Sequence, residues 1–171
     1  MWPYLLTGSL ATVGVIGARA AALKAMDKLR YLPGAPAGTP RFAAGAREGR
    51  PAAMLLFSIG RSGFLAYRER GQYLAWKPYL SWNRMARAAK RDGIDLTSQL
   101  VNSFRTWLHQ QRLASQEGAA PPGFSPHQRG YAVDVNTQGT DGAAAQAWLE
   151  QNAARFGWRR TYWARHHWEF G

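Results

Sequence analysis

Three of the four histidines in this chain lie in two short segments that also contain carboxylates. His127 and Asp134 belong to the first segment, residues 125–135, and His167 belongs to the second, residues 164–170. Imidazole and carboxylate groups bind zinc, and three protein ligands with water in the fourth position are typical of catalytic zinc. These residue types therefore predict a Zn²⁺ site formed by His127, Asp134 and His167. Spacing alone leaves open a second interpretation, in which they are ordinary surface or hydrogen-bonded groups.

A strand over residues 131–136 would place the carboxylate of this site. Side chains alternate between the two faces of a strand, so the apolar residues of this segment face the core while Asp134 faces the open side. The small Ala132 lies on the same open face and leaves room beside the carboxylate. His127 precedes a tight turn at Gly130, and this turn would let its imidazole fold back over that face.

The same alternation applies to the end of the chain. A strand over His167–Phe170 puts His167 and Glu169 on one face, and Trp168 and Phe170 on the other. Apolar periodicity, turns and helix ends predict the remaining elements. Further strands are expected at residues 53–59, 64–67 and 158–162 and within 94–104, and helices at residues 81–93, 106–117 and 143–156. Short strands separated from helices in this way predict an α+β fold.

Composition restricts the chemistry and the partners of the chain. The 171 residues include no cysteine, which excludes disulfides, thiolate zinc sites and cysteine nucleophiles. Twenty-two Lys and Arg against ten Asp and Glu give a net charge of +12. Such a charge favours polyanionic partners, namely nucleic acid, anionic lipid or an acidic cell wall.

The N-terminal third of the chain differs in composition from the rest. Residues 1–31 begin with an uncharged apolar run, Met1 to Ala18, followed by four basic residues. We expect an apolar N-terminal helix there, which acts as a membrane anchor or a docking segment. Residues 32–52 are rich in Pro and Gly and are expected to form a linker to a main domain at residues 53–171.

Four blocks in the main domain resemble a known peptidase family. The block Ser125-x-His127-x-x-Gly130-x-Ala132-x-Asp134 resembles the zinc-binding signature of the VanY-type D-alanyl-D-alanine carboxypeptidases, whose family includes phage L-alanyl-D-glutamate endopeptidases. Three further blocks follow the order of the family. One is residues 102–110, which resemble its Arg-containing segment, and another is residues 152–158, which resemble the helix and turn before its last metal ligand. The last is residues 167–170, which resemble the end of its Glu-Pro-Trp-His-Trp-Glu-Tyr segment. The resemblance runs from about Ser81 to Gly171, just over half of the chain.

The resemblance implies a fold and a role for each matched residue. It implies a hedgehog/DD-peptidase-like fold, with a small, mostly antiparallel sheet, flanking helices and zinc on the open face of the sheet. It implies that His127, Asp134 and His167 bind zinc. It also implies that Arg105 holds the scissile carbonyl and the oxyanion that develops from it. It also implies that Gln110 and Ser125 hold the backbone of a peptidoglycan stem peptide, cut by a D,D-carboxypeptidase or by an L-Ala-D-Glu endopeptidase.

One position departs from the family pattern. The family places a general-base glutamate three residues before its last histidine ligand, and here that position is Ala164. Loss of a general base lowers a rate by about 10²- to 10⁴-fold. Three explanations follow: an inactivated variant, which we favour, a natural pseudoenzyme that binds peptide without cutting it, or a different base. The candidates for a different base are Glu169, His166 and Asp141.

Three classes of function fit these features. The first is a zinc peptidase of peptidoglycan that acts in the bacterial cell envelope, in the periplasm or the cell wall, and whose charge attracts it to the wall. The second is a basic nucleic-acid-binding module, although no specific nucleic acid is expected because no nucleic-acid motif is present. The third is a protein that contacts a membrane or a delivery particle through residues 1–30, as in a phage endolysin or an injected toxin.

Overall fold

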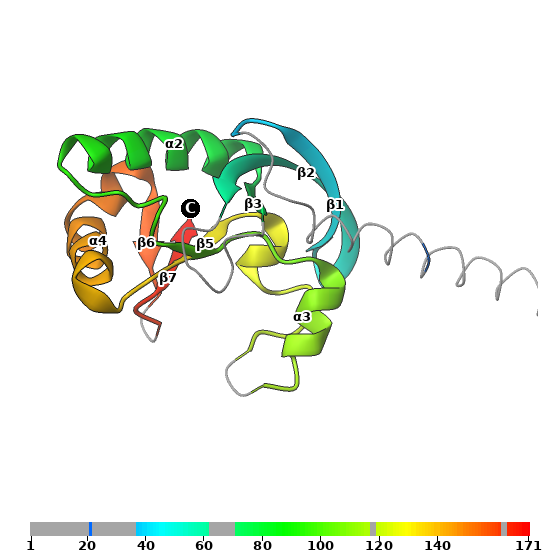
Figure 1. Cartoon of the computed structure of the whole chain (residues 1–171). Helices are drawn as coiled ribbons and strands as arrows, with labels where there is room; N and C mark the ends of the chain where they lie inside the picture. The colour runs from blue at the N-terminus through cyan, green and yellow to red at the C-terminus, as the bar shows by residue number, and fades with distance from the viewer. Residues whose placement is uncertain (1–20, 22–36, 62–70, 117–118, 162–163) are drawn as a thin grey trace, which may run out of the picture.

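The computed structural model describes residues 21, 37–61, 71–116, 119–161 and 164–171 (Figure 1). The expected helix at residues 1–31, apart from the helical Ala21, and the expected strand at residues 64–67 lie outside this range. None of the helices in the described ranges combines the length and the apolar composition that crossing a membrane requires.

The described residues form two antiparallel sheets and three α-helices, which confirms the α+β prediction. The first sheet has the order β1-β2-β3 and the second has the order β4-β5-β7-β6. The strands are β1 (Pro40–Arg47), β2 (Arg50–Arg61), β3 (Gly71–Leu74), β4 (Leu100–Asn102), β5 (Ala132–Val135), β6 (Trp158–Arg160) and β7 (His167–Phe170). The helices are α2 (Trp76–Arg91), α3 (Trp107–Leu113) and α4 (Gly139–Asn152), with short 3-10 turns η2 (Pro126–Arg129) and η3 (Ala153–Phe156).

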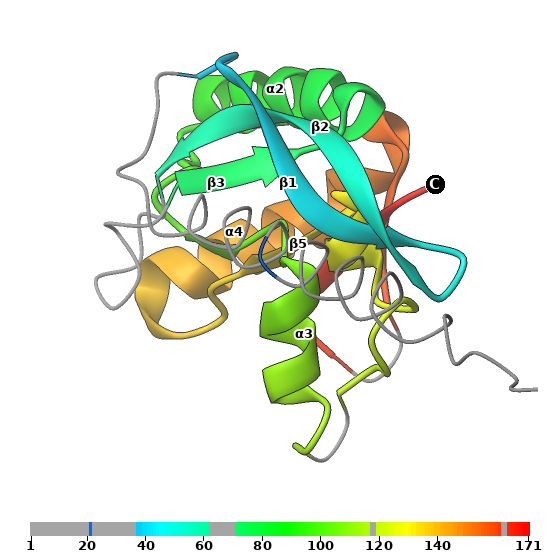
Figure 2. The ribbon, with the colours of Figure 1, turned by 90° about the vertical axis from the view of Figure 1, so that its right-hand side faces the viewer.

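The main core lies on one side of the four-stranded sheet. Val133 and Trp168 point into it from β5 and β7, where they meet Trp82 of α2 and Leu149 of α4. The other face of the same strands carries Asp134, His167 and Glu169 together with the small Ala132, as the sequence predicts. Figure 2 shows the three-stranded sheet with α2 along its upper edge, where the helix contacts β2 and β3. Trp82 and Met85 of the same helix pack in the core cluster with residues of β5 and β7, so α2 joins the two sheets.

The expectation of a linker over residues 32–52 is wrong from Pro40 onward. Residues 40–47 form β1, which pairs with β2 over its whole length. The small residues that suggested a linker instead allow close packing, because a side chain at Gly45 would collide with the backbone carbonyl of Gln128 in η2. Since η2 also carries His127, the Gly and Ala content of β1 lets this strand pack directly behind a site residue.

Helix α2 begins five residues earlier than the sequence predicts. Ser81 is not its N-cap but lies buried within the helix, where its hydroxyl donates to the Phe156 carbonyl and accepts from the Trp158 indole at 3.0 Å. Pro78 lies in the first turn of the helix, where proline is tolerated. The other helices occur where expected, with α3 ending at Leu113 and α4 passing into η3 at Ala153.

Candidate metal centre

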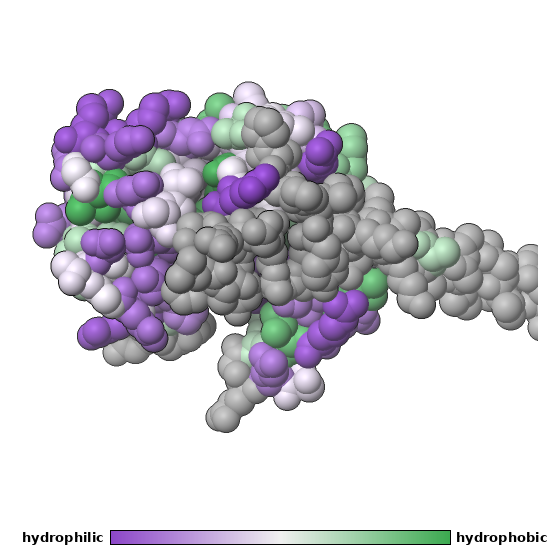
Figure 3. Space-filling model, viewed as in Figure 1, coloured by the Kyte–Doolittle hydropathy of each residue, from purple (hydrophilic) through white to green (hydrophobic). Residues whose placement is uncertain are grey.

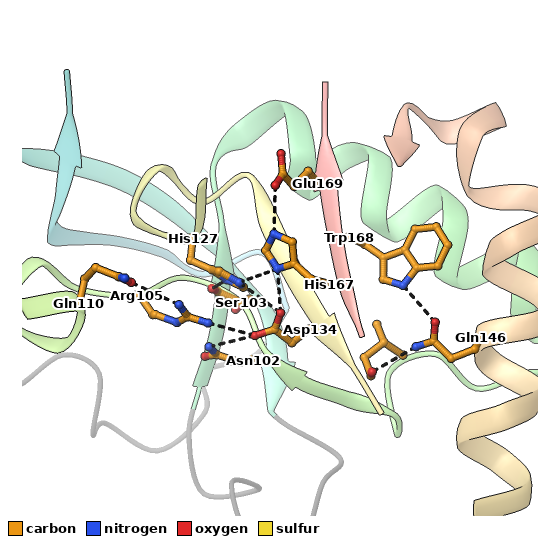
Figure 4. A network of polar contacts seen from close by, with 11 residues as sticks. Asn102, Ser103, Arg105, Gln110, His127, Asp134, Gln146, His167, Trp168 and Glu169 are labelled. Carbon is orange, nitrogen blue, oxygen red and sulfur yellow. Dashed lines mark hydrogen bonds and ion pairs between the residues drawn. The ribbon is translucent and has the colours of Figure 1, made fainter. Parts of the chain in front are cut away.

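The register between β5 and β7 brings two of the expected ligands together. Asp134 and His167 are direct cross-strand partners in this antiparallel pair. Both side chains lie on the face of the sheet that turns away from the core, because the neighbouring Val133 and Trp168 occupy the core side. The hydrophobic alternation of the two strands therefore determines where the carboxylate and the imidazole meet (Figure 4).

The third expected ligand reaches this face from η2. His127 lies in this short turn, which ends at Gly130 with a positive φ of 72°. A side chain at Gly130 would come within 2.7 Å of the Ala75 backbone nitrogen and 2.8 Å of the Leu56 side chain, so glycine lets the chain reverse here. The His127 imidazole is buried, and its Nδ1 hydrogen-bonds to the Ser103 carbonyl.

The three side chains point one atom each toward a common centre. Asp134 Oδ1 lies 2.9 Å from His167 Nδ1 and 3.2 Å from His127 Nε2, and the two nitrogens are 3.1 Å apart. Ligands bound at zinc distances in a tetrahedral arrangement are separated by about 3.3 Å. The observed separations are close to this value, so the donor set fits a zinc ion, and in the described residues these three form a group able to hold a metal.

The remaining nitrogen of each imidazole is held by a partner outside the triad. His167 Nε2 lies 3.1 Å from Glu169 Oε1, while His127 Nδ1 meets the Ser103 carbonyl. Such outer contacts fix which ring nitrogen carries the proton and leave the other free to bind a metal. Glu169 therefore lies behind His167 and orients it (Figure 4).

The electrostatics of Asp134 and His127 favour the charge states that a metal needs. Burial raises the pKa of the Asp134 carboxyl, but the two imidazoles and the Arg105 guanidinium outweigh burial and hold this pKa well below its usual range. Burial lowers the pKa of His127. Burial also lowers the pKa of His167, but its contacts with Asp134 and Glu169 outweigh this effect and raise the pKa overall. At neutral pH Asp134 is therefore ionised and His127 neutral, as in a metal-binding pair.

Arg105 adjoins the triad through the second oxygen of Asp134. Its guanidinium lies 3.2 Å from Asp134 Oδ2 and also donates to Gln110 Oε1 at 3.2 Å. Gln110 is fully buried, and its amide donates to the Ala120 carbonyl at 2.7 Å. Both polar atoms of the Gln110 side chain are therefore hydrogen-bonded within the protein. This favours a role in positioning Arg105 rather than the expected contact with substrate.

A cleft of about 530 Å³ opens over the triad. It is lined by Arg105, Ala119, Ala120, Ser125, Pro126, His127, Asp134, Thr161, Ala164, His166, His167 and Glu169. Ser125 therefore lies in the wall of the cleft, as expected of a substrate contact. Ala164 lies in the same wall, and its carbonyl accepts a hydrogen bond from the His167 backbone at 3.1 Å. Of the three possible substitute bases, Asp141 is not part of the cleft lining.

Sequence reasoning missed two side chains that support the triad. Asn102 donates to Asp134 Oδ2 at 3.5 Å, and its strand partner is Asp134 itself. Gln146 of α4 donates to the Val135 carbonyl at 3.1 Å and accepts from the Trp168 indole at 3.3 Å, so it links the two strands that carry Asp134 and His167 (Figure 4). The sequence gives no signal for Gln146, because a polar residue on a helix is usually exposed.

Known proteins match this chain over the part that contains the site. A family model described as VanY, D-alanyl-D-alanine carboxypeptidase, matches residues 71–170. A D-alanyl-D-alanine carboxypeptidase of Enterococcus faecalis is 40% identical over 55 residues, which cover 31% of this chain and 20% of that protein. The match thus spans only about one fifth of the length of this relative.

Solved structures resemble the chain in its fold. A glutamate-to-alanine variant of the vancomycin-resistance D,D-pentapeptidase VanY, in complex with Zn(II), is 24% identical with a TM-score of 0.51, over 58% of this chain and 74% of that one. The LD-carboxypeptidase LdcB is 22% identical with a TM-score of 0.48, over 57% of this chain and 59% of that one. The first likeness shows a shared fold.

Proposed function

This chain belongs to the VanY family of D-alanyl-D-alanine carboxypeptidases, and from this premise we propose that it is a zinc-dependent peptidase of peptidoglycan stem peptides. The observation that carries the proposal is the convergence of His127 Nε2, Asp134 Oδ1 and His167 Nδ1 within 4.8 Å of one another in the wall of a cleft. The substrate is a peptide with a D-amino acid next to the scissile bond, and the place of action is the bacterial cell envelope.

The residues of the cleft divide the work of hydrolysis. His127, Asp134 and His167 hold the zinc ion, which when bound acts as a Lewis acid that polarises a carbonyl and acidifies water. Arg105 directs its guanidinium into the cleft and donates hydrogen bonds to the carbonyl oxygen, most strongly as negative charge develops there. Gln110 fixes the orientation of Arg105, and Ser125 contacts the substrate backbone.

We propose that the chain hydrolyses its substrate slowly, because Ala164 occupies the position of the expected general base. A methyl group cannot accept a proton from water or deliver it to the leaving amine. Glu169 is a poor replacement because it is engaged with His167 Nε2, on the ring edge opposite Asp134 and His127. The second candidate function, a pseudoenzyme that binds stem peptides without cutting them, rests on this same alanine.

Binding and cleavage of a defined stem peptide test the proposed function. We expect the zinc-loaded chain to bind a pentapeptide ending in D-Ala-D-Ala and to release D-Ala slowly, as detected by calorimetry and mass spectrometry. The chelator-treated chain is the matched control, and it should lose cleavage and weaken in binding. Equal binding with and without zinc, together with no cleavage, would contradict a zinc peptidase. Binding that requires zinc, without any cleavage, would favour the pseudoenzyme.

Glu169 provides a test of the proposed ligand set. We expect Glu169→Gln to weaken zinc binding by about 10- to 100-fold, because the amide is a weaker acceptor for the His167 Nε2 proton. The measurement is a competition titration against a chromophoric chelator. Glu150→Gln serves as a control, since Glu150 is exposed and pairs with Arg160. If both variants bind zinc as the unmodified chain does, Glu169 does not support His167.

A further inference from the structure

Helix α2 presents a row of cations to solvent. Its exposed basic residues are Lys77, Arg84, Arg87, Lys90 and Arg91, and the helix contains no acidic residue. Lys77, Leu80, Arg84, Arg87 and Arg91 recur at alternating intervals of three and four residues, so they share one side of the helix. At 1.5 Å per residue this row is about 21 Å long. Figure 3 shows hydrophilic side chains gathered along the edge of the molecule that α2 forms.

The helix dipole favours Lys90 and Arg91 in the last turn of α2, but it does not account for the cations nearer the N-terminal end. Among the described residues, no carboxylate forms an ion pair with any cation of α2. The acids that follow the helix have other partners, since Asp92 accepts from the Trp148 indole at 2.8 Å and Asp95 accepts from two backbone amides of its own turn. Lys77 lies in the first turn, where the helix dipole favours an acid rather than a cation.

Apolar side chains accompany the cations at the N-terminal end of the row. Trp76 is 53% exposed and Leu80 is 41% exposed. The Trp76 ring is held in place by Tyr79, at a centroid distance of 5.8 Å, and by Phe57, at 4.9 Å. Beside them lies a surface hollow of about 410 Å³, lined by Tyr79, Leu80, Asn83, Arg84 and Arg87. Two guanidinium groups and an amide thus surround a partly apolar depression.

The row lies on the far side of the sheet from the cleft. The inner face of α2 packs through Trp82 and Met85 against the core cluster that contains Val133 and Trp168. Asp134 and His167 lie on the other face of the same two strands. A surface bound by the outer face of α2 would therefore leave the cleft open to a substrate on the opposite side.

We propose that the outer face of α2 docks on the surface of an anionic phospholipid membrane. The row follows one side of a straight helix, and the exposed apolar side chains of Trp76 and Leu80 accompany it, a combination that suits a plane of lipid headgroups better than a single polymer strand. Basic residues near an anionic surface each contribute to binding, and Trp is favoured at the level of the headgroups. The hollow beside Arg84 and Arg87 has the donors to hold one phosphate headgroup.

Vesicle sedimentation with the full-length chain tests this docking surface, and it needs neither zinc nor catalysis. We expect binding to vesicles of phosphatidylglycerol mixed with phosphatidylcholine, little binding to pure phosphatidylcholine, and release at high salt. The triple variant K77Q/R84Q/R87Q should bind the anionic vesicles about 100-fold more weakly. W76A should weaken binding while leaving the salt dependence unchanged, because the charges remain.

The control removes the same charge from a different surface. Arg47, Arg50 and Arg61 are exposed on β1 and β2, so R47Q/R50Q/R61Q changes the net charge equally and should keep most of the binding. Equal losses in both triple variants would overturn the proposal, because net charge alone would then explain binding. Unchanged binding in K77Q/R84Q/R87Q would also overturn it. Displacement from the vesicles by soluble single-stranded DNA, with the same dependence on α2, would assign the row to a polyanion instead.

Discussion

The A164E substitution is expected to raise the rate of stem-peptide hydrolysis by about 10²- to 10⁴-fold, which is the contribution of a positioned general base. Ala164 lies in the wall of the cleft, and its carbonyl accepts a hydrogen bond from the backbone of His167. A carboxylate on this position would reach into the cleft beside the three proposed ligands. The measurement is the release of D-Ala from a synthetic pentapeptide by the zinc-loaded protein.

The matched control is A164Q, which has nearly the same shape as A164E but cannot accept a proton at neutral pH. We expect A164Q to remain as slow as the unmodified chain while retaining zinc. A rate for A164E no higher than that for A164Q, with zinc bound in both, would contradict the role assigned to position 164. A fast reaction in the unmodified chain would instead show that another group already acts as the base.

The local part of the site could be predicted from the sequence. Alternation in two short strands is a strong signal, because it depends only on which side chains the core can bury. It placed Asp134 and His167 on the open face, and the burial of Val133 and Trp168 confirms that arrangement. The turn at Gly130 was also visible, since this position adopts a positive φ that glycine readily allows.

The parts that depend on distant contacts could not be predicted. Residues 40–47 lie in a segment with the composition of a linker, but they form a strand because they pair with β2 over their whole length. The close approach of Gln128 explains why one of them, Gly45, is a glycine. A glutamine on a helix is usually exposed, but Gln110 is buried. There its side chain accepts a hydrogen bond from Arg105 and donates one to the Ala120 carbonyl. Such contacts join residues whose pairing leaves no periodic signal in the sequence.

Replacement of Arg105 is expected to have the second largest effect on catalysis. In the A164E background, R105A should lower kcat by about 10²- to 10³-fold, the usual result of removing one donor to a developing oxyanion. The guanidinium is well placed for this role because Gln110 and Asp134 Oδ2 hold it at 3.2 Å each, so little reorganisation is needed. Steady-state kinetics on the same pentapeptide give kcat and KM separately.

Two further measurements separate the catalytic role of Arg105 from its contact with Asp134. Zinc content should stay at one ion per chain in R105A, since the three proposed ligands remain, whereas R105K should recover part of kcat by keeping the charge. In the unmodified Ala164 chain, R105A should weaken binding of a phosphinate analogue of the transition state more than binding of the peptide. A higher KM with unchanged kcat would instead limit Arg105 to substrate binding.

Anomalous diffraction at the zinc absorption edge, from crystals of the zinc-loaded protein, tests the central claim most directly. We predict a single strong peak about 2.0–2.2 Å from His127 Nε2, Asp134 Oδ1 and His167 Nδ1, with a fourth position open to the cleft. A zinc ion bound elsewhere, or the absence of a peak between these three atoms at saturating zinc, would contradict the proposed metal centre and the hydrolytic function built on it.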